Sequence, residues 1–387
     1  MRHLFRALAG VVLLLAALAV WKRDDLVRLQ AVLTLFEEDR ITGNFSHMDA
    51  AFLSVPVPKG STPPLPLPAG TPFDLPQAAQ DWVVERAVTA LVIVKDGALR
   101  HESYYLGTGP EDRRIGWSVS KSFLSALMGT LVAEGVIALD RQVVDYVPAL
   151  RGSAYEGATV RQVANMTSGV AFDEDYLDFW SDINKMGRVL GLGGSMDDFT
   201  AGITARRGAP GGPWAYVSID THVLGMVIRG ATGRAVVDLL AERIIAPLGF
   251  EVEPYYLTDG TGQPFVLGGL NLITRDYARM GVLFAQNGQV QGRQIVPADW
   301  IAVSTRPQAD TPPGKMGYGY QWWIPQGAEP GEFLAQGVYG QFIYINQRAG
   351  VVIAANGADR GFTAEGVEAQ NIAMFRTLTA AMEAADG

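Results

Sequence analysis

The sequence predicts an α+β fold in which strands from both ends of one domain form a single antiparallel sheet. Residues 89–94 read TALVIV and precede a Lys95-Asp96-Gly97 turn, and residues 341–346 and 351–355 flank a second turn. Runs rich in β-branched residues on either side of a short turn with glycine are typical of β-hairpins. Between these ends the apolar periodicity is mostly helical, so we expect an all-helical lobe, about residues 117–235, inserted between the two parts of the sheet.

The helical patterns follow one another through the middle of the chain. The expected helices cover residues 121–135, 159–166, 221–232, 235–246 and 272–287, and a last one covers about 364–384. Two lobes of one catalytic unit leave a cleft at their junction, which is a usual place for a small-molecule site.

The composition excludes several kinds of chemistry. The 387-residue chain has no cysteine, which excludes a cysteine nucleophile, a thiolate zinc site and a disulfide scaffold. Its four histidines show no H-x-x-x-H spacing, so we expect no metal and no cofactor. The formal net charge of −9 argues against a nucleic-acid partner.

The first 21 residues have the pattern of a targeting segment. Arg2 and Arg6 precede an apolar run at residues 7–21. This run matches the core of a signal peptide and is shorter than the ~20 residues of a membrane span. It could also begin at Leu4 and remain as an uncleaved anchor, and a buried core helix is a third alternative. Under the first two interpretations the protein is exported to the periplasm, with contact to the membrane only through this segment.

Residues 22–80 are expected to form a linker and a proline-rich surface segment before the main domain at residues 81–387. Eight of the 21 prolines lie between Pro56 and Pro76. Such a stretch favours extended polyproline geometry and forms neither a helix nor a central strand.

Ser118 and Lys121 form the strongest candidate for a nucleophile with its base. They are separated by three residues at the start of an apolar-periodic helix, which places both side chains on one helix face. The free N–H groups of the helix N-terminus favour developing negative charge, and a desolvated lysine can act as a base. The alternative is an ordinary N-cap serine followed by a lysine in the first turn.

Several ordered motifs accompany this pair over about residues 40–380. They are Ser118-Val-Ser-Lys121-Ser-Phe, Ile137-Ala-Leu-Asp140 with Val144-Asp-Tyr-Val-Pro148, Thr159-Val-Arg-Gln-Val with Met166-Thr-Ser-Gly169, Tyr216-Val-Ser218, Gly268-Gly-Leu-Asn271 with Arg275-Asp-Tyr-Ala-Arg279, and Gly337-Val-Tyr-Gly340-Gln341. Together they resemble the serine β-lactamase and penicillin-binding-protein superfamily. The resemblance is to its class C-like branch, which includes esterases and 6-aminohexanoate-dimer (nylon oligomer) hydrolases. It implies the β-lactamase/transpeptidase-like version of the α+β fold.

The resemblance also implies roles for individual residues. Ser118 would be acylated, and Lys121 would accept its proton or hold Tyr216 in a state able to do so. Tyr216 would pass the proton to the leaving group and later activate water. Which of the two is the general base stays open, because coupled groups titrate as a unit. The backbone N–H groups of Ser118 and Val338 would form the oxyanion hole.

The chain departs from the family pattern at the third motif. Ala335-Gln336-Gly337 stands where relatives have K-T-G or H-x-G, so the cation that would pair with a substrate carboxylate is missing. Lys315 precedes a strand that comes one strand too early to replace it. This loss argues against a penicillin-like substrate and is compatible with acyl transfer.

Four further residues are second-tier candidates for substrate contact: Tyr176, Asn271, Ser218 and Gly337. Tyr176 belongs to an acidic loop at residues 173–178, which would either favour a substrate with a free amine or lie solvated at the surface. We therefore predict a serine hydrolase that cleaves a small-molecule ester or unstrained amide through an acyl-enzyme. The alternatives are a true β-lactamase or DD-peptidase, and a non-catalytic, membrane-held binding module with the same fold.

Overall fold

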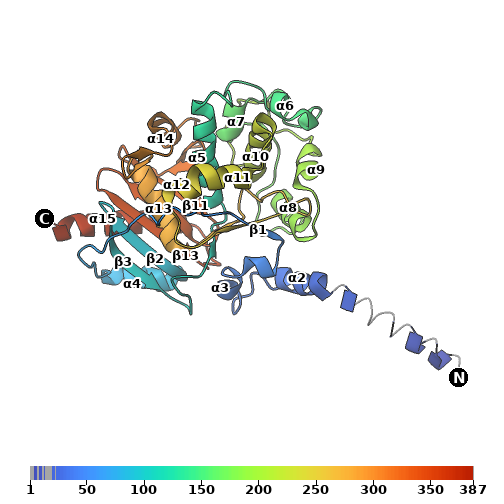
Figure 1. Cartoon of the computed structure of the whole chain (residues 1–387), viewed down its shortest axis with the longest axis horizontal. Helices are drawn as coiled ribbons and strands as arrows, with labels where there is room; N and C mark the ends of the chain where they lie inside the picture. The colour runs from blue at the N-terminus through green and yellow to red at the C-terminus, as the bar shows by residue number, and fades with distance from the viewer. Residues whose placement is uncertain (1–3, 7, 11–12, 14–19, 22, 387) are drawn as a thin grey trace.

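The computed structural model describes residues 4–6, 8–10, 13, 20–21 and 23–386. A seven-stranded antiparallel sheet in the order β3-β2-β13-β12-β11-β10-β9 forms the larger lobe (Figure 1). Its strands are β2 (Val88–Lys95), β3 (Ala98–Tyr104), β9 (Gly317–Gly319), β10 (Trp322–Ile324), β11 (Glu332–Gly337), β12 (Gln341–Asn346) and β13 (Val351–Gly357). The pairing of β2 with β13 joins the two ends of the domain, which confirms the predicted sheet.

Helices cover both faces of this sheet. Successive side chains of β13 alternate between two cores, with Val352 and Ala354 in the main core and Val351 and Ile353 in a second one. The second core also contains side chains of α4 (Gln77–Glu85) and α15 (Val367–Asp386). On the other face lie α5 (Val119–Ala133), α13 (Thr274–Ala285) and α14 (Ala298–Ser304).

The smaller lobe is helical, as predicted. It contains α6 (Val143–Tyr146), η2 (Pro148–Leu150), α7 (Val160–Ala164), α8 (Asp182–Gly191), α9 (Met196–Ala201) and α10 (Ser218–Thr232). A capping box of Thr159 and Gln162 begins α7, and α10 ends at Gly233, whose φ of 68° suits a residue without a Cβ. The single helix expected at 235–246 is α11 (Val236–Leu240), the π-helical η3 (Ala241–Ile245) and α12 (Ala246–Leu248) in succession.

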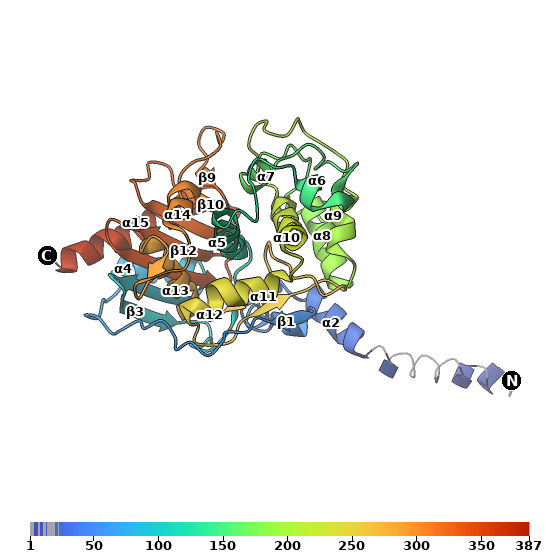
Figure 2. The same cartoon turned by 45° about the horizontal axis from the view of Figure 1, so that its top comes forward.

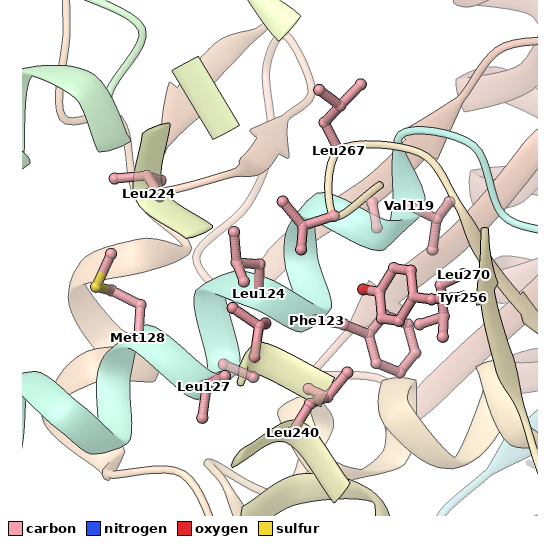
Figure 3. Close-up of a cluster of buried hydrophobic side chains, with 14 of the residues drawn as sticks. Val119, Phe123, Leu124, Leu127, Met128, Leu224, Leu240, Tyr256, Leu267 and Leu270 are labelled. Atoms are coloured by element: carbon pink, nitrogen blue, oxygen red, sulfur yellow. The ribbon is translucent and has the colours of Figure 1, made fainter. Parts of the chain in front are cut away.

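Helix α5 lies between the two lobes (Figure 2). Its residues from Val119 to Leu131 are all buried, so it has no polar face toward solvent. Phe123, Leu124 and Leu127 pack with side chains from α10, α11 and the segment around Leu270 (Figure 3). The start of α5 is therefore fixed by contacts from both lobes.

Residues 23–57, which precede the main domain, contain elements that pack against it. It contains α2 (Arg23–Leu33), α3 (Ile41–Asn44), η1 (Met48–Ala50) and β1 (Ser54–Pro56), and Phe45, Met48 and Val57 are buried in the main core. β1 joins a four-stranded sheet with β5 (Tyr255–Leu257), β6 (Leu270–Leu272) and β4 (Arg114–Ile115), and β7 (Gln289–Val290) pairs with β8 (Arg293–Gln294). Part of the expected linker at residues 22–80 thus belongs to the folded unit.

Within the described part of the chain, no helix is both long and apolar enough to span a bilayer. Most of residues 7–21 lies outside the described residues, so their assignment as signal peptide or anchor stays a prediction.

Candidate active site

Ser118 and Lys121 meet at the start of α5. Ser118 is the N-cap residue, and Lys121 Nζ donates hydrogen bonds to Ser118 Oγ at 3.0 Å and to the Leu267 carbonyl oxygen at 2.8 Å. Trp117, directly before the nucleophile candidate, has a φ of 44°, in a region that residues with a Cβ rarely adopt. This strained turn leaves Ser118 half-buried at the helix end while Lys121 is only 2% exposed.

Burial changes the charge state of Lys121. It lowers the pKa of the amine to about 7, and the negative charge of Glu174 opposes this shift. An ammonium loses its hydration shell when buried, so the neutral form becomes accessible near neutral pH. A neutral amine 3.0 Å from Ser118 Oγ can accept the hydroxyl proton.

Tyr216 completes the group. It directly precedes α10, and its ring is stacked on Trp323 with a centroid separation of 5.3 Å. Lys121 Nζ lies 5.4 Å from the centroid of the Tyr216 ring. Burial and the charge of Glu174 raise the pKa of Tyr216, and the hydroxyls of Ser118 and Ser218 oppose that rise. The structure thus brings the three predicted residues together across the two lobes.

The end of β11 lies directly against the start of α5. A Cβ added to Gly337 would be 2.5 Å from the Gly116 carbonyl oxygen and 3.1 Å from the backbone nitrogen of Ser118. Gln341 fixes the turn that follows, since its Nε2 donates to the Gly357 carbonyl oxygen at 2.7 Å and to that of Tyr339 at 3.2 Å. This close approach is compatible with the oxyanion hole of Ser118 and Val338, which stays a prediction.

Glu174 is the site residue that sequence reasoning missed. Its carboxylate accepts hydrogen bonds from the backbone N–H of Ser218, from Ser218 Oγ at 3.0 Å and from the Tyr176 hydroxyl at 3.1 Å. Burial raises the pKa of this carboxyl, and Lys121 and Ser218 oppose the rise. Nothing in the spacing of the acidic loop separates Glu174 from its neighbours, because the pairing with Ser218 joins residues 44 positions apart.

The neighbouring carboxylates have a different environment. Asp173, Asp175 and Asp178 are exposed, and each accepts a backbone N–H of the same loop, from Asp175, Leu177 and Trp180 respectively. These hydrogen bonds shape the loop. They leave the expected preference for a substrate amine as a prediction.

The remaining residues considered in the sequence analysis are buried or lie near the edge of the sheet. Asn271 lies in β6 with no exposed surface, and its Nδ2 donates to the Gly269 carbonyl oxygen at 2.9 Å, so a substrate would reach it only after the surrounding strands move. Lys315 is exposed before the edge strand β9, and Ala335 is buried in β11. Among the described residues there is no group of three potential metal ligands.

Comparison with known proteins agrees with this geometry. A family model described as Beta-lactamase matches residues 81–370. The chain belongs to the beta-lactamase family. This family member is 31% identical to the 6-aminohexanoate-dimer hydrolase of Paenarthrobacter ureafaciens over 284 residues, which cover 70% of this chain and 72% of that protein. It is 30% identical to esterase EstB of Burkholderia gladioli over 148 residues, only 34% of this chain and 36% of the esterase.

Solved structures show the same fold. A Bacillus anthracis protein assigned provisionally as a 6-aminohexanoate-dimer hydrolase superposes with a TM-score of 0.76 at 24% identity, covering 90% of this chain and 96% of that one. A family VIII carboxylesterase superposes with a TM-score of 0.58 at 16% identity, and the match covers 73% of this chain and 89% of the carboxylesterase. The predicted β-lactamase/transpeptidase-like fold is confirmed, and this beta-lactamase-family chain is a hydrolase related to 6-aminohexanoate-dimer hydrolase and to esterases.

Proposed function

We propose that this beta-lactamase-family hydrolase cleaves an ester or an unstrained amide through an acyl-enzyme on Ser118. The observation that carries the proposal is the hydrogen bond from the buried Lys121 Nζ to Ser118 Oγ at 3.0 Å, with Tyr216 beside both. A hydroxyl becomes an effective nucleophile when a positioned base with a pKa near the working pH accepts its proton.

Acylation begins when Ser118 Oγ attacks the substrate carbonyl carbon and its proton moves to Lys121, directly or through Tyr216. The carbonyl oxygen becomes an oxyanion, which the N–H groups of Ser118 and Val338 would stabilise. The bond to the leaving oxygen or nitrogen then breaks, and Tyr216 donates the proton that the leaving group needs. The acyl group stays esterified to Ser118.

Deacylation repeats these steps with water as the nucleophile. The Tyr216–Lys121 pair accepts a proton from water, and the resulting hydroxide attacks the acyl carbon. The ester bond to Ser118 breaks, Ser118 Oγ regains a proton, and a carboxylic acid leaves. The free enzyme is restored with no cofactor consumed.

The substrate class follows from what faces Ser118. Ala335 gives the end of β11 no cation for a substrate carboxylate, which disfavours penicillin-like substrates. The relatives named above include an amide-dimer hydrolase and an esterase, which supports a linear amide or an ester. A true β-lactamase or DD-peptidase is the second candidate.

Labelling with a fluorophosphonate tests the proposal. We expect the wild type to be labelled and Ser118→Ala not to be. Ser125→Ala is the matched control, because Ser125 is a buried serine on the same helix whose hydroxyl has no hydrogen-bond partner among the described residues. Equal labelling of wild type and Ser118→Ala would refute the role of Ser118.

A substrate panel separates the remaining alternatives. We expect turnover of p-nitrophenyl esters or linear amides that depends on Ser118. Rapid hydrolysis of nitrocefin would favour the β-lactamase alternative instead. Absence of turnover and of any acyl adduct by mass spectrometry would favour a binding module.

We also propose that the protein is exported, with its N-terminal segment either cleaved or anchored in the membrane. N-terminal sequencing of the protein from soluble and membrane fractions distinguishes these two forms. A protein that retains Met1 and fractionates only with the cytoplasm would contradict export.

A further inference from the structure

The steps proposed above leave one polar group of the cleft without a role. Glu174 lies in the loop at residues 173–181, its charge acts on Lys121, and all three of its described hydrogen-bond donors belong to Ser218 and Tyr176. Three donors already occupy most of the acceptor positions of this half-buried carboxylate. Its contacts lead to the two proposed proton-transfer residues.

We propose that Glu174 is a positioning residue of this site, whose carboxylate fixes the Tyr216–Ser218 segment and supplies the negative charge that faces Lys121. The proposal rests on the proposed function, because it assigns Glu174 a role through the proton-transfer pair of that function. The inference goes beyond the proposed function because it states which group sets the orientation and the charge balance of Lys121 and Tyr216.

The positioning role follows from hydrogen bonds at the start of α10. The backbone N–H and the hydroxyl of Ser218 each donate to a different oxygen of Glu174, so the carboxylate holds the first residue of α10 at two points. Met166 holds the residues on either side of Tyr216, accepting N–H groups from Val217 at its sulfur and from Ala215 at its carbonyl oxygen. A helix N-terminus also favours a nearby anion. Tyr216, two residues before Ser218, is oriented by these contacts.

The charge role follows from the groups that face Glu174. Lys121 approaches it from α5, Tyr176 from its own loop, Tyr216 and Asp220 from the α10 side, and Tyr318 from β9. Tyr155 interacts electrostatically with both Glu174 and Asp220, and Arg207 interacts with Asp220. The tyrosines are neutral near pH 7, since burial raises the pKa of each.

Asp220 does not compete for this role. Its carboxyl is fully buried and accepts the Tyr155 hydroxyl at 2.8 Å, and burial raises its pKa to about 8. At neutral pH it is therefore mostly uncharged. Glu174 differs from Asp220 because three hydrogen-bond donors, two from Ser218 and one from Tyr176, favour its charged form against the effect of burial. It is therefore the group placed to carry the negative charge that balances a protonated Lys121.

The direction in which Glu174 shifts the pKa of Lys121 follows from these charges. A negative charge near an amine favours the ammonium, so Glu174 raises the pKa of Lys121 against the effect of burial. Removing that charge with Glu174→Gln lowers the pKa of Lys121 further. Glutamine keeps an acceptor and a similar shape for Ser218, whereas Glu174→Ala removes the charge and the hydrogen bonds together.

The titration of Lys121 tests the charge role without any substrate. The chain has only six lysines, so a 13C-lysine NMR spectrum is simple, and Lys121→Met assigns its signal. We expect a midpoint near 7 in the wild type and a midpoint lower by about one unit in Glu174→Gln, within the range that one nearby charge produces. Asp175→Asn, in the same loop and exposed, is the matched control and should leave the midpoint unchanged. An unchanged midpoint in Glu174→Gln overturns the charge role.

The pH profile of kcat/KM on a p-nitrophenyl ester tests the positioning role. We expect the acid limb of Glu174→Gln to move to lower pH with most of the plateau retained, and Glu174→Ala to lose on the order of 10²-fold of the plateau. Thermal unfolding shows whether Glu174→Ala is folded. If it is not, Ser218→Ala, which removes the hydroxyl donor and keeps the carboxylate, replaces it and should also lower the plateau. A wild-type plateau in the folded variant overturns the positioning role. Failure of the proposed function can be distinguished from failure of the role of Glu174. In the first case the wild type itself would show no turnover that depends on Ser118, while the NMR titration would still report the effect of Glu174 on the pKa of Lys121.

Discussion

The two lobes contribute differently built parts to the candidate active site. On the side of the sheet, Ser118 and Lys121 lie on a helix whose other residues are buried from Val119 to Leu131, and Gly337 is pressed against its start. On the side of the helical lobe, the loop at residues 173–181 carries Glu174 but leaves Leu177, Phe179 and Trp180 with 79%, 59% and 70% of their surface exposed. The side that would form the covalent bond is a buried helix, and the side that carries Glu174 is an exposed loop, an arrangement that is common where loops carry functional residues on a scaffold.

The charges differ in the same way. The side of the sheet contributes one buried cation, Lys121, and the lobe side contributes the half-buried carboxyl of Glu174 and the fully buried carboxyl of Asp220. Each buried charge or carboxyl is tolerated through hydrogen bonds and neutralisation, because isolated ions are strongly disfavoured in a protein interior. The proposed chemistry therefore depends on residues from both lobes.

The largest effect is expected from removing the cation. Lys121→Met should lower kcat/KM on an ester by about 10³-fold or more, since the amine that accepts the Ser118 proton directly or through Tyr216 is lost, while the unbranched side chain still fills its space. Steady-state kinetics and fluorophosphonate labelling measure this. Lys185→Met, on the exposed surface of α8, is the control. Activity of Lys121→Met within tenfold of the wild type would contradict the proposed role.

A smaller loss is expected from disturbing the contact of β11 with α5. Gly337→Ala places a Cβ 2.5 Å from the Gly116 carbonyl oxygen, which must move the strand or the helix start and should reduce kcat by about 10²-fold. Kinetics and thermal unfolding are measured together. Gly187→Ala, with open space around its added Cβ, is the control. Unchanged kcat in a folded Gly337→Ala would argue against an oxyanion hole at this contact.

On the lobe side, Asp220 should make stability depend on pH. Its folded-state pKa of about 8 lies above the ordinary value of 3.8 for an aspartate, because the carboxyl is buried, so the folded state holds the proton more tightly and the stabilisation is lost as pH rises from about 4 to about 8. Asp220→Asn stays neutral and keeps an oxygen for the Tyr155 hydroxyl. We expect its Tm relative to the wild type to increase between pH 5 and pH 8.

The exposed Asp310→Asn is the control for this measurement and should show no such trend. A parallel pH dependence of the Tm in wild type and Asp220→Asn would show that Asp220 is already charged in the folded protein.

The smallest effect is expected at the exposed loop. Trp180→Ser removes a side chain that contacts Phe179 and lies 5.9 Å from the Arg188 guanidinium, so the free energy of unfolding should change by less than about 0.5 kcal/mol. Chemical denaturation measures this, and kcat/KM on a small ester should stay at the wild-type value. A tenfold rise in KM would show that this loop contacts substrate. The loop would then take part in binding, as α5 would take part in catalysis.

Much of the fold was predictable because its signals are local. The strands at residues 88–95 and 341–357 are dense in β-branched and aromatic residues, and the turn residues between them are distinctive. The packing of residues 35–57 onto the domain was not predicted, because prolines nearby indicate only the local backbone conformation. The π-helical step at Ala241–Ile245 likewise has no simple sequence signal.

The candidate site also has one part that the sequence predicts and one part that only the tertiary structure shows. The sequence by itself determined the contact between Ser118 and Lys121, because a separation of three residues in one helix fixes that neighbourhood wherever the helix lies. Only the tertiary structure decided that Glu174 holds Ser218 and faces Lys121, since those residues come from separate segments that the packing of α5 against α10 brings together. It also decided the state of Lys121, because a lysine has a pKa near 7 only when both lobes remove its water.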